Sequence, residues 1–267
     1  MSIKLYTIDN IMNNAVVDSA TSQATGFPKE NLIDNNLDTY WKPTSEANQT
    51  IDIDLQIAKI VDYAYVFVQN YTLHTVSSVF LLQYSDDAFS NNSNGMVAAQ
   101  GMGNMLLSPH RTYEISETAT AHRYWRITIA SFAGTVPNIS AIWLCKEYDV
   151  GQTAEYPYKD SDIFASKKIK TGGDRIFTTV QNKKSSKSLP RQFLISGTTN
   201  KDALRNAHQD CKGDAVPVVV QEGTTYDDIV VCKFKDDKFS KNEKAYQLYN
   251  PKITLNELPY IDSGDSY

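Results

Sequence analysis

The chain has 267 residues and a formal net charge of −5 at pH 7, with 31 acidic and 26 basic residues. It is long enough for two domains of ordinary size. Neither half carries the clustered positive charge that phosphate binding requires, which argues against nucleic acid as a partner. The N-terminus lacks the apolar run of a signal peptide, and no stretch approaches the roughly 20 apolar residues of a membrane span. We therefore expect folding in a cytoplasm and no membrane insertion.

Composition differs between the two halves of the chain. Residues 1–150 hold 8 Lys and Arg and 15 Asp and Glu, together with all three Trp. Residues 151–267 hold 18 Lys and Arg and 16 Asp and Glu. This difference in charge and tryptophan content indicates that the two halves form separate folding units. We predict a first domain at 1–150, a linker at 151–171, a second domain at 172–258 and a C-terminal tail at 259–267. The lysine runs at 167–170 and 183–187 are interpreted as solvated loops.

The first half is predicted to be all β. Apolar runs or apolar/polar alternation of strand length occur at 51–55, 61–68, 79–84, 124–129 and 139–144. Polar or Gly-containing loops separate them, which favours an antiparallel sandwich over alternating strands and helices. Residues 91–109 form an excursion between strands, with a short strand expected at 105–107.

The second half has another order of elements. Strand-like runs at 175–180 and 192–196 precede a helix predicted at 199–212, where Ala203, Leu204, Ala207 and Cys211 recur at helical spacing and Gly213 marks the stop. Strand-like runs at 216–220, 229–234 and 246–255 follow. This order predicts a smaller β-rich domain with one helix.

Three cysteines, Cys145, Cys211 and Cys232, stand far apart. An odd number excludes complete pairing in disulfides, and no close pair has zinc-ligand spacing. A reducing site of folding is the simpler interpretation.

The polar loop at residues 31–41 is rich in Asn and Asp and ends at two aromatics, Tyr40 and Trp41. Such side chains hydrogen-bond the nearby backbone, which predicts a structured loop. With Ser19, Ser22 and the segments 52–55, 83–87, 123–127 and 139–144, this loop resembles the discoidin domain, also called the coagulation factor 5/8 type C domain, in the form found in bacterial carbohydrate-binding modules. The resemblance covers roughly residues 10–148 and implies a jelly-roll β-sandwich.

The pattern of residues 172–258, with 189–193 before the helix and 213–218 after it, resembles the small β-rich domain of bacteriophage tail and baseplate proteins such as distal tail proteins. This resemblance depends on the order of the elements more than on distinctive residues. It implies a domain that docks into a larger assembly.

Tyr40 and Trp41 have two interpretations. Aromatic faces suit the apolar face of a sugar ring, but in the discoidin family the aromatic after the polar loop packs beneath it, and we favour packing.

The resemblance also implies a structural Ca²⁺ site in the loop, held by Asp34, Asp38 and Thr39 and closed by Glu147 near the end of the domain. Ca²⁺ takes six to eight oxygen ligands, which such a loop is suited to supply. In the alternative interpretation, the same side chains cap the amides of the loop without metal.

Carbohydrate-binding relatives in the discoidin family place a His, an Arg, an Asn and an aromatic on loops at one end of the sandwich. The residue types that match are Asn70, Tyr71, His74, Arg111 and Phe132. The alternative is that these are ordinary loop residues without a shared ligand.

No catalytic residues are predicted. Glycosidases hold two carboxylates at a set separation in a cleft, whereas the adjacent pairs Asp86-Asp87 and Asp227-Asp228 would point apart in extended chain. No nucleophile elbow, phosphate loop or zinc motif is present.

Two functional hypotheses follow. The first is a homo-oligomeric structural protein of a bacteriophage tail or baseplate, a virion component assembled in the host bacterial cytoplasm, whose discoidin-like module contacts host-surface glycan or protein. The second is a free-standing bacterial carbohydrate-binding or adhesin protein. In a variant of the first hypothesis, the sandwich binds no sugar and contacts only other tail proteins.

Overall fold

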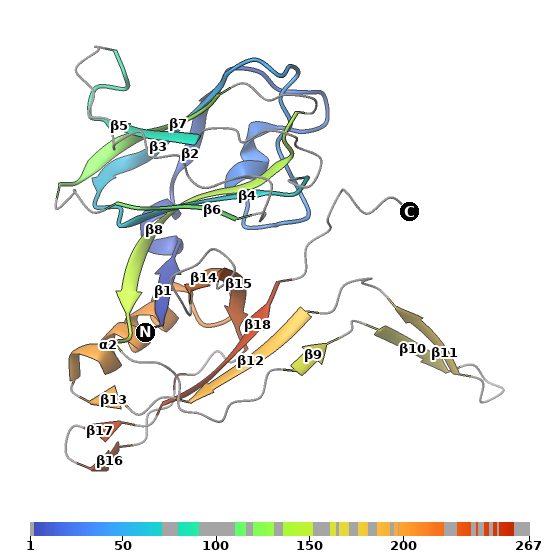
Figure 1. The fold of residues 1–267 in the computed structure, drawn as a ribbon, viewed down its shortest axis with the longest axis vertical. Helices are drawn as coiled ribbons and strands as arrows, with labels where there is room; N and C mark the ends of the chain where they lie inside the picture. The colour runs from blue at the N-terminus through green and yellow to red at the C-terminus, as the bar shows by residue number, and fades with distance from the viewer. Residues whose placement is uncertain are drawn as a thin grey trace.

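The computed structural model describes residues 3–70, 80–90, 110–115, 120–130, 136–151, 161–163, 166–170, 176–180, 186–192, 195–196, 198–221, 229–235, 239, 243–245, 248–249 and 251–258. Within these residues the fold is mainly β, as predicted (Figure 1). No described helix is long and apolar enough to cross a membrane.

A short sheet forms one layer of the N-terminal sandwich. Its strands are ordered β2-β3-β7-β5 and all neighbours are antiparallel. Their bounds are β2 Val16–Ala20, β3 Gln49–Lys59, β5 Phe80–Ser85 and β7 His122–Ile129. Buried and partly exposed residues alternate along β7, as expected when only one face of a strand lies against a core. The strands predicted at 51–55, 79–84 and 124–129 are thereby confirmed.

A long sheet forms the other layer and continues into the second half of the chain. Among the described strands its order is β6-β4-β8-β1-β14-β15-β18-β12-β9. The bounds are β1 Lys4–Thr7, β4 Tyr63–Val68, β6 His110–Glu114, β8 Ile139–Asp149, β9 Ser161–Ile163, β12 Ser186–Gln192, β14 Val218–Gln221, β15 Ile229–Phe234 and β18 Lys252–Glu257.

Strand β1 joins the two halves of the chain. Tyr6 pairs with Glu147 of β8 on one side and with Val219 of β14 on the other. Strand β8 therefore runs beyond the predicted end at residue 144, because its last residues pair with β1. The sheet crosses the predicted boundary at residue 150 without interruption, and the predicted linker at 151–171 includes β9. The division into domains stays a prediction.

Successive side chains of β1 and β14 point to opposite faces of the long sheet. They therefore belong to two different hydrophobic clusters of described residues. Tyr6 and Val219 belong to the first cluster, which fills the sandwich and the adjoining face of the long sheet. Leu5, Val218 and Val220 belong to the second cluster, with residues of helix α2. The first cluster thus contains side chains from both halves of the chain.

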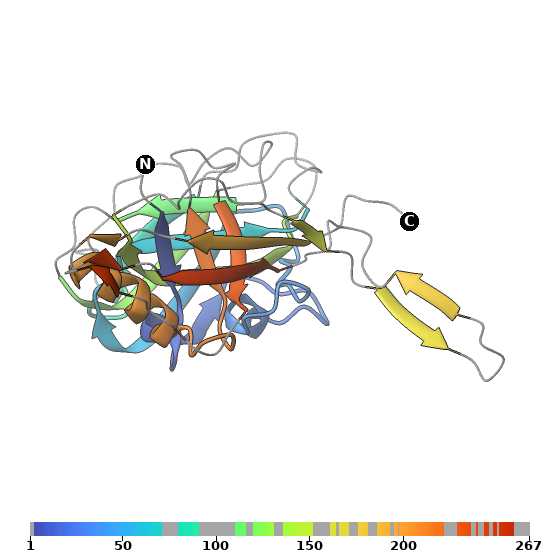
Figure 2. The same ribbon diagram turned by 90° about the horizontal axis from the view of Figure 1, so that it is seen from below.

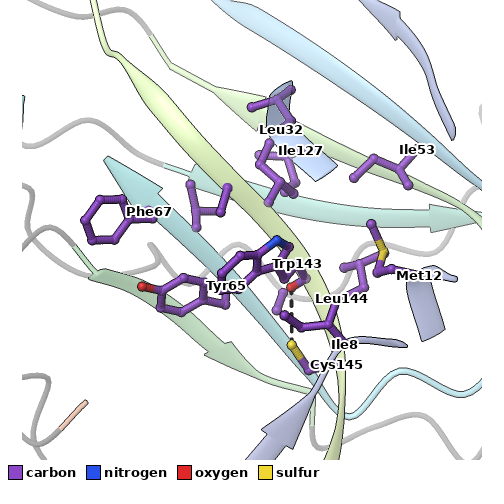
Figure 3. Packing of buried hydrophobic residues seen from close by; sticks show 14 of the residues in the cluster. Ile8, Met12, Leu32, Ile53, Tyr65, Phe67, Ile127, Trp143, Leu144 and Cys145 are labelled. Atoms are coloured by element: carbon purple, nitrogen blue, oxygen red, sulfur yellow. Dashed lines mark hydrogen bonds between the residues drawn. The ribbon is translucent and has the colours of Figure 1, made fainter. Parts of the chain in front are cut away.

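Large aromatic and aliphatic side chains fill the first cluster (Figure 3). On one face of β8, Trp143 stacks with Tyr65 at a centroid distance of 5.3 Å. On the other face, Leu144 lies toward Ile8 and Met12, which flank or belong to the short helix α1 (Asp9–Met12). The 3₁₀ helix η1 (Lys29–Ile33) adds Leu32 to the same core. Strand β8 is therefore buried on both faces.

Helix α2 (Thr198–Asp210) confirms the helix predicted at 199–212 and packs against β8 and β1. Its buried residues include Leu204 and Ala207, which belong to the second cluster. Gly213 ends the helical segment with φ +69°, a conformation that glycine adopts at low cost, and its amide donates to the carbonyl of His208 at 3.0 Å. The predicted stop signal at Gly213 is confirmed.

Shorter strands complete the second half. Strands β13 (Ile195–Ser196), β17 (Leu248–Tyr249) and β16 (Glu243–Ala245) form a small sheet. Strands β10 (Ser166–Lys170) and β11 (Ile176–Val180) form a hairpin that projects from the body of the molecule in both views (Figures 1 and 2). The lysine run at 167–170 is therefore part of a strand and not a loop, which corrects the sequence interpretation. The strand predicted at 105–107 lies outside the described residues.

All three cysteines are buried free thiols, in agreement with the absence of a predicted disulfide framework. Burial raises the pKa of the Cys145 and Cys211 thiols above the ordinary range.

Candidate functional site

Loops from both layers meet at one end of the sandwich, which we call the loop end. Strand β2 ends there at Ala20, β4 at Val68 and β7 at Ile129, while β3 and β8 begin there. Backbone bonds tie these loops together: Trp41 and Ile139 exchange N–H···O bonds of 2.8 and 3.0 Å, and the amide of Gln69 donates to Asn138 at 2.9 Å. Strand β1 and the second half of the chain join β8 at the opposite end.

Two of the predicted carbohydrate-binding residues belong to described segments at the loop end. Asn70 follows β4, and Arg111 lies on β6 directly opposite Val66 of β4. Tyr71, His74 and Phe132 lie outside the described residues. The backbone topology thus brings Asn70 and Arg111 to one region, while a shared ligand stays a prediction.

Asn70 itself has a structural role. Its side chain is only 2% exposed. The Nδ2 atom donates to the carbonyl of Val136 at 2.9 Å, and Oδ1 accepts from the amide of Asn138 at 2.8 Å. Both polar atoms therefore hold the segment before β8 in place and point away from solvent, which the residue type alone did not reveal.

The polar loop at residues 31–41 satisfies its own backbone, as predicted. Asp34 accepts from the amide of Asn36 at 2.9 Å and from the hydroxyl of Thr39 at 2.6 Å. Asn36 in turn accepts from the amide of Asp38 at 3.0 Å, and Asn31 donates to the carbonyl of Tyr40 at 2.9 Å. These bonds give the loop a defined shape.

A buried side-chain amide reaches this loop from Gln69, the residue that follows strand β4. Nε2 of Gln69, a residue only 3% exposed, donates to the carbonyl of Leu37 at 2.6 Å. This bond satisfies a backbone acceptor that would otherwise be buried without a partner. Gln69 is a residue that the sequence analysis did not single out.

The predicted calcium ligands do not come together as a set. Asp34, Asp38 and Thr39 share the loop, but Glu147 lies eight positions beyond Ile139 along β8, roughly 26 Å away at about 3.3 Å per residue. Glu147 instead accepts from Lys4 at 3.2 Å, and burial raises the pKa of its carboxyl despite that partner. The described residues contain no group of three or more His, Cys, Asp or Glu that could hold a metal.

The fit to calcium is therefore incomplete. Glu147 does not close the loop, because β8 carries it away to the joint with β1. What the loop itself offers is two carboxylates and a hydroxyl, one of the carboxylates already accepting two hydrogen bonds. A calcium site confined to Asp34, Asp38 and Thr39 stays a prediction.

The two aromatics that end the loop have different positions. Trp41 is fully buried and its Nε1 donates to the carbonyl of Ser22 at 3.1 Å, which confirms the packing interpretation for this residue. Tyr40 is partly exposed and stacks on Phe27 at a centroid distance of 4.7 Å. Lys42 lies over the Phe27 ring at 6.0 Å. Among the described residues of the loop end, Phe27 and Tyr40 therefore form a partly exposed aromatic pair.

Carboxylates on the outer face of the short sheet are paired with arginine. Asp54 accepts two bonds of 2.7 Å from Arg123, and Asp52 accepts bonds of 2.6 and 2.9 Å from Arg126. The hydrogen bond from Arg123 lowers the pKa of Asp54, against the opposing effect of burial. Such bidentate pairs stabilise the ionised form of a carboxylate. The general acid of a glycosidase instead requires a carboxyl group whose pKa is raised.

Comparisons with known proteins concern the first half of the chain. No curated protein matches the sequence. A carbohydrate-binding module of family 32 from Clostridium perfringens NanJ, solved with galactose, is 16% identical with a TM-score of 0.43, over 53% of this chain and 99% of the module. A Ruminococcus gnavus family 29 fucosidase is 22% identical with a TM-score of 0.42, over 52% of this chain and 26% of the enzyme.

The predicted tail or baseplate role of residues 172–258 gains no support from these comparisons and stays a prediction. The sequence profile of the F5/8 type C domain matches residues 16–145. The matched segment begins at β2 and ends within β8, and it contains both layers of the sandwich and every loop of the loop end. Residues 16–145 therefore match the F5/8 type C domain, and they form the β-sandwich that the sequence predicted.

Proposed function

We propose that the chain is a non-catalytic carbohydrate-binding protein whose F5/8 type C domain contacts glycan through the loop end. The observation that supports this most strongly is the family match at residues 16–145. Domains of the type that the chain resembles bind sugars on loops at one end of the sandwich. Here that end lies opposite the joint of β8 with β1, so the described strands of the second half lie away from these loops.

The loop end offers an aromatic surface for a sugar ring. Phe27 and Tyr40 are partly exposed and stacked, with an interplanar angle of 19°. Aromatic faces bury the apolar face of a pyranose, and nearby polar groups fix its orientation. We assign the stacking contact to this pair and the polar contacts to His74 and Arg111.

Binding of a single copy is expected to be weak. A shallow surface of two rings buries little of a ligand compared with a closed pocket. Several copies on one particle or surface would raise the effective concentration and convert weak contacts into firm attachment.

The test is a glycan array probed with the whole chain, followed by calorimetric titration of the sugars that bind. Tyr40→Ala and Phe27→Ala are expected to weaken binding by about tenfold or more, as loss of a stacked ring does elsewhere. Phe89→Ala is the matched control, because Phe89 is a partly exposed aromatic that lies against Arg126, beyond the opposite end of β5.

Equal loss in the control and the test variants would indicate an effect on folding. An array without any bound sugar would refute the proposal and favour a sandwich that contacts only proteins. A third outcome is that both ring variants still bind sugar, whereas His74→Ala and Arg111→Ala do not. The proposed function would then hold, but the binding site would be assigned to the loops that carry His74 and Arg111.

A further inference from the structure

The hairpin of β10 (Ser166–Lys170) and β11 (Ile176–Val180) forms an extension that we call the arm. Its strands are antiparallel, with Ile169 opposite Phe177 and Lys170 opposite Ile176. Among the described strands, β10 and β11 pair only with each other. Both views show the hairpin away from the sandwich, beyond the end of the long sheet that β9 forms (Figures 1 and 2).

A separate two-stranded ribbon is at best marginally stable in water. Each strand of the arm has one edge that pairs with no other described strand, and such edges are templates for pairing with another chain. Strand β11 also carries Ile176, Phe177 and Val180, which are residues that a protein surface covers and a polyanion does not. The arm therefore has the features of a protein-docking element.

Charge identifies the kind of partner. Residues 164–185, between β9 and β12, contain six Lys and Arg and one Asp, a net charge of +5. The whole chain has −5, so the remainder of the chain carries −10. Most of this negative charge lies in residues 1–150, which hold 8 basic and 15 acidic residues, a net charge of −7. Opposite charges steer association and select partners.

We propose that the arm docks onto the acidic N-terminal half of a second copy of this chain. Each molecule then presents both partners of the contact, a basic projecting ribbon and an acidic body. Two copies that exchange arms form a closed dimer, whereas head-to-tail docking forms a ring or a filament. In each arrangement the arm gains a neighbour beyond the described strands of its own chain, in which β10 and β11 pair only with each other.

The experiment is sedimentation velocity of the whole chain over a wide range of concentrations, at low salt and at about 0.5 M salt. We expect self-association that weakens at high salt. Lys168→Glu with Lys170→Glu is expected to raise the dissociation constant by about tenfold or more. The control is Lys233→Glu with Lys235→Glu, which changes the net charge equally on strand β15 and the residue that follows it.

Circular dichroism and thermal unfolding of both double variants verify that the body remains folded. A wild-type chain that stays monomeric at every concentration and at low salt overturns the proposal. Equal association of the arm variant and the wild type overturns it as well. A monomer whose arm binds heparin or anionic vesicles would assign the arm to an anionic polymer instead.

Discussion

Replacing Leu5 by alanine tests whether strand β1 unites both halves of the chain in one cooperative unit. Leu5 is fully buried in the cluster beneath helix α2, and its strand lies between β8 and β14. Truncating a buried leucine costs about 2–5 kcal/mol through lost burial and the cavity left behind. If the free energy of unfolding falls by about 2–3 kcal/mol per molar urea, the urea concentration at the unfolding midpoint should fall by roughly 1 M.

Two signals followed during urea unfolding make this assay specific. All three tryptophans lie in the first half of the chain, so their fluorescence reports on the sandwich. Far-ultraviolet circular dichroism also reports on helix α2 in the second half. Because the long sheet is continuous, we expect both signals to shift together.

A tryptophan transition that stays at the wild-type midpoint, while the dichroism signal moves, would refute this reasoning. It would mean that the sandwich is stable without β1. Ile57→Ala is the control, since Ile57 is 64% exposed and its truncation should change stability by no more than about 0.5 kcal/mol.

Two further predictions concern single hydrogen-bonding groups. Gln69→Ala leaves the carbonyl of Leu37 without its donor and should lower the free energy of unfolding by about 1–3 kcal/mol, measured in urea, whereas Gln83→Ala on the short sheet should have little effect. Asp54→Asn should destabilise the protein at neutral pH. Since Arg123 lowers the pKa of Asp54 in the folded state, that stabilisation is present above the ordinary aspartate pKa of about 3.9 and is lost as the pH falls through the folded value. The difference in thermal unfolding between the two proteins should therefore shrink as the pH falls below about 3.9, and a difference that stays constant down to pH 2 would contradict the assignment.

Much of the sandwich could be predicted because its strands carry a local signal. The alternation at residues 51–55 and 124–129 is set by one buried face, and the sequence displays it directly. Strand β1 has only four residues, and its partners lie more than a hundred residues away. Nothing local distinguishes such a segment from a loop, so the joint between the two halves was missed.

The site was predicted less well, because side-chain direction depends on tertiary structure. Asn70 has a residue type suited to sugars, yet both of its polar atoms bond the backbone of a neighbouring segment. Phe27 stands alone between Gly26 and Pro28, where no periodic pattern marks it. Glu147 was expected at the loop because its distance from the loop depends on the length of β8, which no local pattern reveals.

The distribution of the buried thiols has a practical consequence. Cys145 belongs to the first hydrophobic cluster, whereas Cys211 and Cys232 belong to the second. A thiol reacts as the thiolate, and burial both shields these groups and raises the pKa of Cys145 and Cys211. Alkylation during brief exposure to denaturant, with each modified peptide identified by mass, would therefore time the opening of each cluster separately in the unmodified protein.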